Sequence, residues 1–576
     1  MSSLLNIGLT GLYAAQAQLT TTSHNISNAA TPGYHRQTVQ QSNAEPLLRG
    51  GSFFGQGTEV DSVQRSYSQY LEGQVMLNDN RRAEYAAYSQ QVSQVDNLLG
   101  DPSVGLAPAM ADFFAAAQDV SANPTNIASR QALLSTGESL VARFQSLGGR
   151  LDEISRGVDA DIDATVSSIN SYARQIAELN QRILDSRATS GGATANDLYD
   201  LRDKAVTGLN QLVRATTLPQ DDGSISVFIG SGQRLVLGND AAQLGTAPGA
   251  GEGGGVGITL IGRDGSASPL SESLLTGGSL GGLLAFRREA LVSAQGSLSD
   301  IATSLANAFN AQHRLGLDLD GKLGRDFFTF DSGGRIAMAI SDPTLVAAAG
   351  AVLGSTPPGN VGSMRISDVR LTGVSSAAAG TALSFPSLTY TFNKASKLFE
   401  ISGAAAGYSP TSFAYDPATD GGSGKVVNVT GPGGVSLSFK ISGIPDVNAS
   451  TNVSDSFALA DNAGGVADNR NAVLLGALQT TKLMFNDASG TPTATLNNAY
   501  AQLVGKVGNK AREVQTGEKA QDALLAQAKA TRDSVSGVNL DEEAANLVRF
   551  QQAYQASARV MSVAQTLFDT MLAIGR

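Results

Sequence analysis

Cysteine and tryptophan are both absent from this chain of 576 residues. The lack of cysteine excludes disulfides, thiolate metal ligands and thiol nucleophiles. Histidine is scarce as well, with only His24, His35 and His313 in the whole sequence. Because a metal site needs several ligands close together, three scattered histidines do not indicate one. The sequence therefore predicts no metal site.

Positive charge is also in short supply. The chain carries 40 Lys and Arg residues against 51 Asp and Glu residues, which gives a formal net charge of -11 and a pI near 4.9. A surface that binds nucleic acid usually needs a basic stripe. We therefore expect neither nucleic acid nor an anionic membrane surface as a partner.

Long hydrophobic runs are missing too. No stretch reaches the roughly 18 continuous apolar residues that a transmembrane helix needs, so we expect no membrane insertion. The N-terminus does not resemble a secretory signal, because its first basic residue is Arg36 and because Asn6, Gln16 and Gln18 interrupt the apolar residues. We expect any export to proceed without a cleaved signal peptide of that type.

What the sequence does have is an apolar heptad repeat at each end. A spacing of seven places one residue on the same seam of a helix every two turns, which is typical of helices that pack along a partner helix. The repeats predict two long terminal helices that pair as a coiled coil and leave other apolar faces for further helices. The seam residues, and hence the predicted assembly interface, are Leu5, Leu12, Leu19, Ile26, Leu547, Tyr554, Met561 and Phe568. We also hypothesise that both ends are frayed in the free monomer.

The middle of the chain changes character several times. An irregular stretch containing Pro46 follows the first helix, and helical patterns then continue to about residue 213. Isoleucines 162, 169, 176 and 183 predict a long helix, for which a buried core face is favoured over an interaction seam. Alternating residues in 225–229 and 234–237 predict a β-hairpin, and 332–458 has mainly strand patterns, including 388–392 and 435–441.

The predicted fold class is therefore α+β, with long terminal helices that pair as a coiled coil, a helical-bundle body and an inserted mainly-β domain. The predicted terminal domain comprises 1–45 and 537–576. The predicted body comprises 46–331 and 459–536, with a β-hairpin region near 215–260. The inserted β-rich outer domain is expected at 332–458.

Three short motifs hint at chemistry, but each has a simpler explanation. Gly277–Gly281 matches a nucleophile elbow around Ser279, although no buried strand precedes it. Gly249–Gly254 matches the letters of a dinucleotide fingerprint, but Pro248 disrupts the approach. Asp318 and Asp320 do not complete a calcium loop. We expect no catalytic residue, no cofactor and no enzyme activity.

The segment His24–Tyr34 resembles the N-terminal signature of bacterial flagellar rod, hook and hook-associated proteins. The family-motif residues within it are Asn25, Asn28, Pro32, Gly33 and Tyr34. Further stretches resemble the flagellar hook-associated protein 1 family, which forms the first hook–filament junction. They are Asn196–Asp203, Gly278–Arg287, Ala467–Ala472 and Val538–Tyr554.

This resemblance implies a structural axial protein that is extracellular, at the hook–filament junction, after export by the flagellar type III apparatus. Its implied partners are further copies of itself, the hook protein, a second junction protein leading to the filament, and a chaperone that binds the C-terminal segment before export. It also implies that the terminal helices form the inner tube of the axial structure. Under this reading Asn25, Asn28 and Gly33 set how the first helix ends.

Three alternatives stay open at the level of the sequence. The first is another axial protein, such as a hook or distal rod component. The second is a secreted serine hydrolase that uses Ser279. The third is a Gly-rich surface adhesin whose binding face is the β-rich domain.

Overall fold

The computed structural model describes residues 2–49, 51–101, 105–189, 195–262, 265–402, 406–446 and 454–574. The chain forms two compact units, each of which draws on several separate stretches of sequence. Unit 1 comprises Met1–Gln94, Glu153–Val292 and Asn509–Arg576, and unit 2 comprises Val95–Asp152 and Ser293–Gly508. Among the described residues, no helix is long and apolar enough to cross a membrane.

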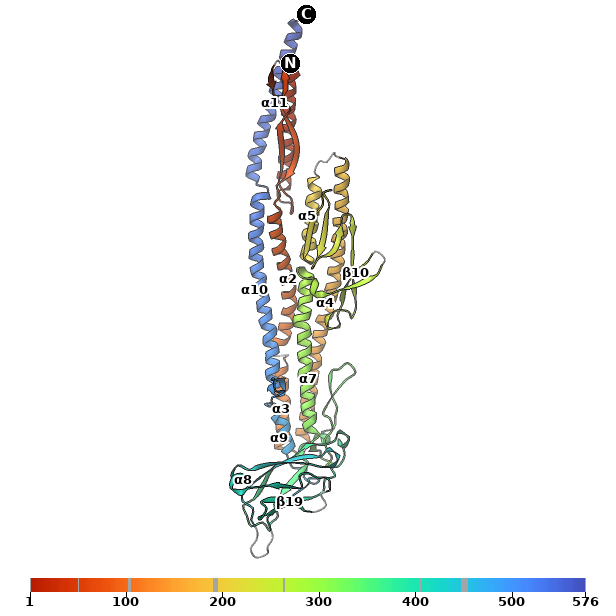
Figure 1. The fold of residues 1–576 in the computed structure, drawn as a ribbon, viewed down its shortest axis with the longest axis vertical. Helices are drawn as coiled ribbons and strands as arrows, with labels where there is room; N and C mark the ends of the chain where they lie inside the picture. Colours follow the sequence, from red (N-terminus) through yellow and green to blue (C-terminus); the bar gives the residue numbers. More distant parts are fainter. Residues whose placement is uncertain are drawn as a thin grey trace. The chain divides into compact units, whose positions relative to one another are not determined.

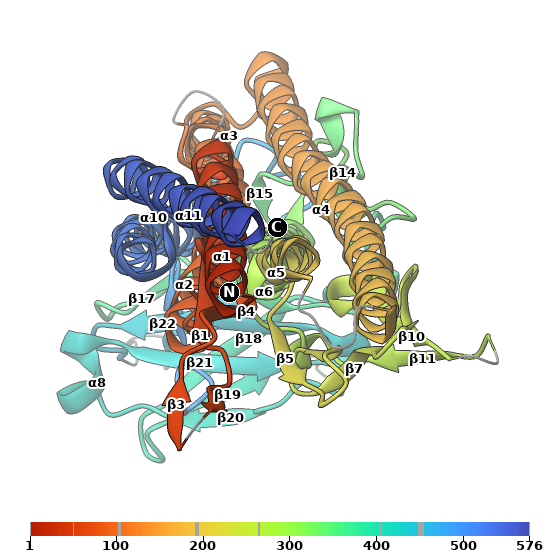
Figure 2. The same cartoon turned by 90° about the horizontal axis from the view of Figure 1, so that it is seen from above.

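The two ends of the chain lie together in unit 1. Helix α1 (Ser2–Asn28) and helix α11 (Leu540–Ile574) are side by side in both views (Figures 1 and 2). They run antiparallel, because Gly8 lies next to Met561 whereas Asn25 near the other end of α1 bonds Glu543. The prediction of paired terminal helices is confirmed.

A long β-hairpin follows α1. Strand β1 (Gln37–Asn43) pairs antiparallel with β4 (Thr58–Arg65), with a bulge between Gln40 and Gln41. Its tip is a second pair, β2 (Leu47–Arg49) and β3 (Ser52–Phe54). The expectation of an irregular stretch here was wrong. The strands are mostly polar, so they lack the apolar alternation that announces a half-buried strand, and they form against α1 instead.

The rest of unit 1 is a helical body with two small sheets. Its helices are α2 (Gln69–Gly100), α4 (Ile127–Thr189), α5 (Asn196–Leu212), α6 (Gly278–Phe286) and α10 (Leu496–Ser536), of which α2, α4 and α10 have their other ends in unit 2. Its four-stranded sheet has the order β5 (Ala215–Pro219), β6 (Ile225–Ile229), β7 (Gln233–Leu237) and β8 (Asp240–Ala241). The three-stranded sheet joins β9 (Gln243–Ala247), β10 (Gly257–Ile261) and β11 (Ala267–Leu270).

The isoleucine repeat on α4 belongs to the core of this body. Ile162, Ile169, Ile176 and Ile183 are all fully buried, which confirms a core face rather than an interaction seam. The predicted hairpin is strands β6 and β7. Helix α2 packs on α10 through a small cluster of Val75 with Leu525 and Ala528.

Unit 2 combines helices with a β-sandwich. Its own helices are α3 (Leu106–Ala122), α7 (Val292–His313), α8 (Pro417–Ser423) and α9 (Arg470–Ala477), with Val292 at the boundary. Phe113, Phe309, Phe327 and Phe328 pack together with ring centroids 4.8–5.8 Å apart, and so join α3, α7 and the segment 327–328. Short pairs are formed by β12 (Gly316–Leu317) with β15 (Ala349–Gly350), β13 (Phe328–Phe330) with β14 (Ile336–Met338), and β24 (Met484–Asn486) with β25 (Pro492–Ala494).

The sandwich encloses its own apolar core, and its strands are drawn in teal in Figure 1. One sheet has the order β16 (Val352–Ser355), β23 (Ser456–Asp461), β18 (Leu388–Asn393), β19 (Leu398–Ser402) and β20 (Ser412–Ala414). The other has the order β17 (Arg365–Gly373), β22 (Ser436–Ser442) and β21 (Lys425–Thr430). An α+β fold with an inserted mainly-β region is thus confirmed, while the predicted three-domain borders stay a prediction.

Candidate assembly surface and its polar anchor

The contact between α1 and α11 is made by small residues. A Cβ added at Gly8 would lie 2.9 Å from Met561 Cγ, and one added at Gly11 would lie 2.9 Å from Ser557 Oγ. Ala14 and Ala15 on α1 are buried. Because these positions carry little or no side chain, the two helices approach closely along this seam.

The predicted heptad residues lie only partly inside this contact. On α1, Leu5, Leu12, Leu19 and Ile26 are all partly buried, as are Leu547 and Met561 on α11. Tyr554 is 37% exposed and Phe568 is 45% exposed. A single pair of helices therefore does not cover the seams that the sequence marks.

Many large apolar side chains stay exposed on the same two helices. We call them together the open face. On α11 its members are Val548, Tyr554, Val560, Val563, Leu567, Phe568, Met571 and Leu572, and on α1 they are Leu4, Ile7, Leu9 and Tyr13. So many exposed apolar side chains on two adjoining helices favour an interaction site here. The helix α1 has no Asp, Glu, Lys or Arg, which lowers the cost of covering it.

The signature residue Asn25 holds the base of the helix pair. Its buried side-chain amide donates to Gln37 O (2.9 Å) and Glu543 Oε2 (3.1 Å), and its oxygen accepts from Gln37 N (2.9 Å) and Tyr34 Oη (2.8 Å). Burial and nearby carboxylates raise the pKa of Tyr34, which keeps its hydroxyl a donor. The amide thus donates two hydrogen bonds and accepts two, so this buried polar group is fully paired.

The remaining signature residues end α1 and turn the chain. Asn28 Nδ2 donates to His24 O (3.0 Å), and Asn28 Oδ1 accepts from Thr31 Oγ1 (3.2 Å). Pro32 is exposed, and Gly33 has a φ of +83°, in the left-handed region that favours glycine at the end of a helix. These residues therefore direct the backbone from α1 into the hairpin.

Glu543 is the buried carboxylate of this base. Arg36 Nε donates to Glu543 Oε1 (2.7 Å), and Arg36 Nη1 reaches Glu542 Oε2 (3.1 Å) at the exposed edge. Asn539 Oδ1 caps α11 by accepting from the backbone N–H groups of Asp541 (3.0 Å) and Glu542 (3.3 Å). The start of α11 is thus locked to the chain segment that follows α1.

His35 sits next to Arg36 and faces the helical body. Its Nδ1 lies 2.8 Å from Asp200 Oδ1 on α5, and its Nε2 lies 3.2 Å from Glu72 Oε1 on α2. Burial by itself would lower the pKa of His35, but the hydrogen bonds to the two carboxylates outweigh it and raise the pKa to about 9. His35 is therefore a cation at neutral pH and joins α2 and α5 to the segment that follows α1.

The segment Asn196–Asp203, singled out by resemblance alone, supplies the acceptors. Arg65 Nη1 from β4 lies 2.7 Å from Asp200 Oδ1 and 2.8 Å from Asp203 Oδ2. Asp197 Oδ1 accepts from Gln37 Nε2 (3.0 Å). The three aspartates recur at a spacing of three, which places them along one helix face and could have indicated a cationic partner. His35 and Arg65 were not predicted as functional residues.

Ser279 lies in a closely packed region and has no catalytic partner beside it among the described residues. Its Oγ is buried and has no hydrogen-bond partner among the described residues, so no histidine lies within reach of it. The glycines beside it serve close packing, because a Cβ at Gly282 would collide with Glu84 O of α2. No group of three or more His, Asp or Glu in the described part of the chain could hold a metal ion.

Models of known protein families match both ends and the body of the chain. The model of flagella basal body rod protein matches residues 5–35, and the model of the C-terminal region of flagellar basal body rod FlgEFG proteins matches 532–574. The model of the helical domain of flagellar hook-associated protein FlgK matches 92–328. Together with the paired terminal helices, these matches define an axial protein of the bacterial flagellum.

Full-length relatives specify the family. The chain is 34% identical to flagellar hook-associated protein 1 of Escherichia coli and of Salmonella typhimurium, over 100% of both chains in each case. It is also similar to the FlgK hook junction protein of Burkholderia pseudomallei, with 26% identity, a TM-score of 0.69, and coverage of 80% of this chain and 100% of that one. The chain belongs to the flagellar hook-associated protein 1 family.

Proposed function

We propose that this chain is a structural component at the junction between the flagellar hook and filament, built in by self-assembly of its terminal helices. Its relatives are named hook-associated protein 1, and the similar Burkholderia structure is described as a hook junction protein. The observation that carries the proposal is the open face of α1 and α11, which a single copy leaves in contact with water.

The eight heptad residues are the proposed assembly interface. Tyr554 and Phe568 contribute most to contacts between copies, because they are the most exposed of the eight. The six partly buried residues hold the helix pair together. They become fully buried when helices of neighbouring copies pack against the pair. Burying a large apolar side chain stabilises by about 1.5–3 kcal/mol, so a few such residues per copy suffice to drive association.

Neighbouring axial proteins are the proposed partners at either end of the junction. The hook protein lies on one side, and a second junction protein leads to the filament on the other. The chain acts outside the cell, as part of the flagellum. Both partners meet the same helix pair, whose exposed side chains include many large apolar ones.

A cytoplasmic chaperone that covers the C-terminal segment before export is part of the proposal. An α-helix with exposed apolar residues at three- and four-residue spacing fits the apolar groove of a helical partner. Tyr554 and Phe568 lie on α11 and would dock in such a groove. Replacing both with Ser should weaken chaperone binding measurably, and wild-type affinity would refute this placement.

Microscopy of a deletion mutant is the direct test of the function. Cells lacking this chain should carry hooks without filaments and shed flagellin into the medium. Complementation by Tyr554→Ser with Phe568→Ser should fail to restore filaments. Leu524→Ser, which alters an equally exposed leucine on α10, should restore them and serves as the matched control. Normal filaments on the deletion strain would overturn the proposal.

Circular dichroism tests the self-assembly step separately. If the terminal helices are frayed in the free monomer, the helical signal should rise when the purified chain polymerises, because helices of marginal stability form when apolar surface is buried against them. Equal helicity before and after polymerisation would show that the terminal helices are already complete in a single copy.

A further inference from the structure

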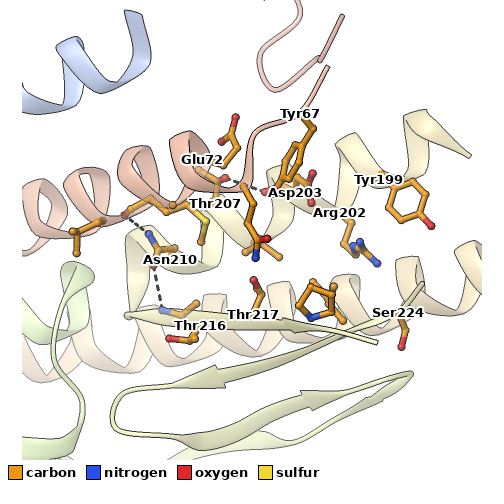
Figure 3. A pocket seen from close by; sticks show the side chains of 18 of the residues that line it. Tyr67, Glu72, Tyr199, Arg202, Asp203, Thr207, Asn210, Thr216, Thr217 and Ser224 are labelled. Atoms are coloured by element: carbon orange, nitrogen blue, oxygen red, sulfur yellow. Dashed lines mark hydrogen bonds between the residues drawn. The ribbon is translucent and has the colours of Figure 1, made fainter. Parts of the chain in front are cut away.

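Unit 1 has a cavity between α2, α5 and β5, which Figure 3 shows from close by. Two carboxylates at this cavity are already paired inside the unit. Asp203 Oδ2 lies 2.8 Å from Arg65 Nη1, and Glu72 Oε1 lies 3.2 Å from His35 Nε2. These carboxylates are therefore not free to bind a partner.

The end of the hairpin that follows α1 is different, because its side chains lie open to water. Leu47 pairs with Phe54, and Leu48 pairs with Phe53, across strands β2 and β3. All four side chains are exposed, and Phe53 is the most open of them at 72%. We call these four residues the apolar tip. The stem of the same hairpin, β1 and β4, is mostly polar, so large apolar residues are concentrated at its end.

The apolar tip carries apolar side chains on both of its faces. Successive residues of a strand point to opposite faces, so the pair Leu47 and Phe54 lies on one face and the pair Leu48 and Phe53 on the other. A ribbon that rested on its own helix would bury one pair, but neither pair is buried. Because an isolated two-stranded ribbon is only marginally stable in water, the tip would gain from a covering surface.

Contacts along α1 fix the height of the tip. The hairpin leaves its base near Asn25 and runs beside α1 to Gly57, where an added Cβ would lie 3.2 Å from Ile7 Cα. On α11, Met561 is at the same height, because it adjoins Gly8. From this height both the apolar tip and the last part of α11 continue towards the start of α1.

The last part of α11 is an apolar surface at the height of the tip. We call its exposed large residues the α11 end, and they are Val563, Leu567, Phe568, Met571 and Leu572. Figure 2 shows β3 projecting from α1 on the side that α11 does not occupy. One copy thus has the apolar tip on one flank and the α11 end on another. Two different surfaces placed in this way join copies head to tail, which closes a ring or extends a helical assembly.

The charges of the two surfaces are compatible with such a contact. The segment 46–54 contains one charged residue, Arg49, and the segment 560–574 contains one, Asp569. Their charges have opposite sign. A contact between the segments therefore brings no like charges together and removes few charges from water.

We propose that the apolar tip of one copy packs on the α11 end of the next copy in the junction. This contact removes from water apolar side chains that a single copy leaves exposed on both surfaces. The occupant is a second copy because both surfaces belong to every copy, at one height and on different flanks. The inference rests on the proposed self-assembly and names two surfaces that meet in it.

Cross-linking tests the contact directly, because the chain has no cysteine and one introduced thiol is unique. Phe53→Cys and Leu567→Cys chains are mixed, assembled and treated with a short bismaleimide. They should give about tenfold more mixed dimer than Phe53→Cys with Leu524→Cys, because docking raises the effective concentration of the two thiols. Leu524 is a similarly exposed leucine of α10 and serves as the control. Mass spectrometry of the linked peptides identifies the mixed pair, and equal yields would overturn the inference.

A variant of the tip provides an independent arm. Leu48→Ser with Phe53→Ser changes two exposed residues, so near-ultraviolet circular dichroism should stay that of wild type. Sedimentation velocity should show self-association weakened about tenfold, equivalent to about 1.4 kcal/mol. Val426→Ser with Ile444→Ser, which alters two exposed apolar residues of unit 2, should associate as wild type does. A folded tip variant that associates as tightly as wild type would overturn the inference.

The outcomes separate this inference from the proposed function. If the wild-type chain assembles but the link between positions 53 and 567 is absent, the proposed function stands and the tip contact is wrong. The same conclusion follows if Phe53→Cys in cells is linked to the hook protein and not to another copy. If the wild-type chain does not assemble and the deletion strain grows normal filaments, both the proposed function and this inference fail.

Discussion

Asn25 and Glu543 are 518 residues apart in the sequence, yet a hydrogen bond of 3.1 Å joins their side chains. Both are buried, and Glu543 also binds Arg36. This contact ties the first helix to the last at the point where each meets the body of unit 1. The terminal pair is thus fixed at its base by a buried polar contact.

Removing the buried carboxylate should loosen that base. We expect Glu543→Ala to lower the opening free energy of α1 by about 1–3 kcal/mol, because Asn25 and Arg36 lose a buried acceptor. Hydrogen exchange of the α1 amides measures this. Glu542→Ala, which removes the exposed partner of the same arginine, should cost less than about 1 kcal/mol. Equal losses in the two variants would contradict the role given to Glu543.

Close approach of the terminal helices should depend on glycine at position 8. Gly8→Leu should destabilise the α1–α11 pair by about 1–3 kcal/mol, because the new side chain overlaps Met561. Limited proteolysis near both chain ends would report the loosened pair. Gly505→Leu on α10, where a Cβ meets nothing within 4 Å, should be neutral or slightly stabilising. Wild-type resistance of the Gly8→Leu chain to protease would show that the helices do not pack at this seam.

The free energy of unfolding should fall at alkaline pH, because the ion pairs of His35 with Asp200 and Glu72 are lost. The folded-state pKa of His35 is raised to about 9 from an ordinary value of 6.5. The folded state therefore holds this proton more tightly, so the contribution of His35 is complete below pH 6.5 and is lost as the pH rises through about 9. Thermal unfolding between pH 6.5 and 10 should show the decline. His35→Gln should be less stable than wild type at pH 6.5 and should show a flatter pH dependence.

The buried histidine of unit 2 should act in the opposite direction. His313 Nε2 accepts from Ala347 N (2.9 Å) and Nδ1 donates to Arg325 O (2.6 Å), while burial lowers its pKa to about 4. The unfolded chain binds the proton first, so this contribution to stability is present above pH 6.5 and is lost as the pH falls towards 4. Acid titration of unit 2 unfolding by near-ultraviolet circular dichroism should show this, and an unchanged acid slope in His313→Gln would contradict it.

Ser279 should be dispensable. Its buried hydroxyl has no partner among the described residues, so we expect Ser279→Ala to leave stability unchanged or to raise it by up to about 1 kcal/mol. Motility should be normal, and esterase activity should be undetectable in both chains. Loss of an activity present in wild type would instead support the hydrolase alternative.

Local patterns were sufficient for much of the fold. The terminal heptads predict α1 and α11, and the isoleucine repeat predicts a buried face of α4. The strand patterns at 388–392 and 435–441 predict β18 and β22. Each of these signals arises from residues near one another in sequence. The hairpin of β1 and β4 gave no such signal, because its strands are mainly polar and are stabilised by packing against α1.

Only the apolar seam of the candidate site could be predicted from the sequence. The seam residues could be identified because a period of seven is a local property of the chain. The polar contacts of His35 could not be identified, because His35 and Asp200 are 165 positions apart and no local pattern indicates that they meet. The three aspartates of Asn196–Asp203 show a spacing that favours a cationic partner, but they do not say which cation.

The sequence by itself determined that this chain has two terminal helices with apolar seams, because helical periodicity and apolar burial act over a few turns. Only the tertiary structure decided which side chains remain open after the helices pair. It also decided that His35 is held as a cation between two carboxylates. Burial and charge pairing depend on distant segments brought to within a few ångströms, and that information appears only when the chain has folded.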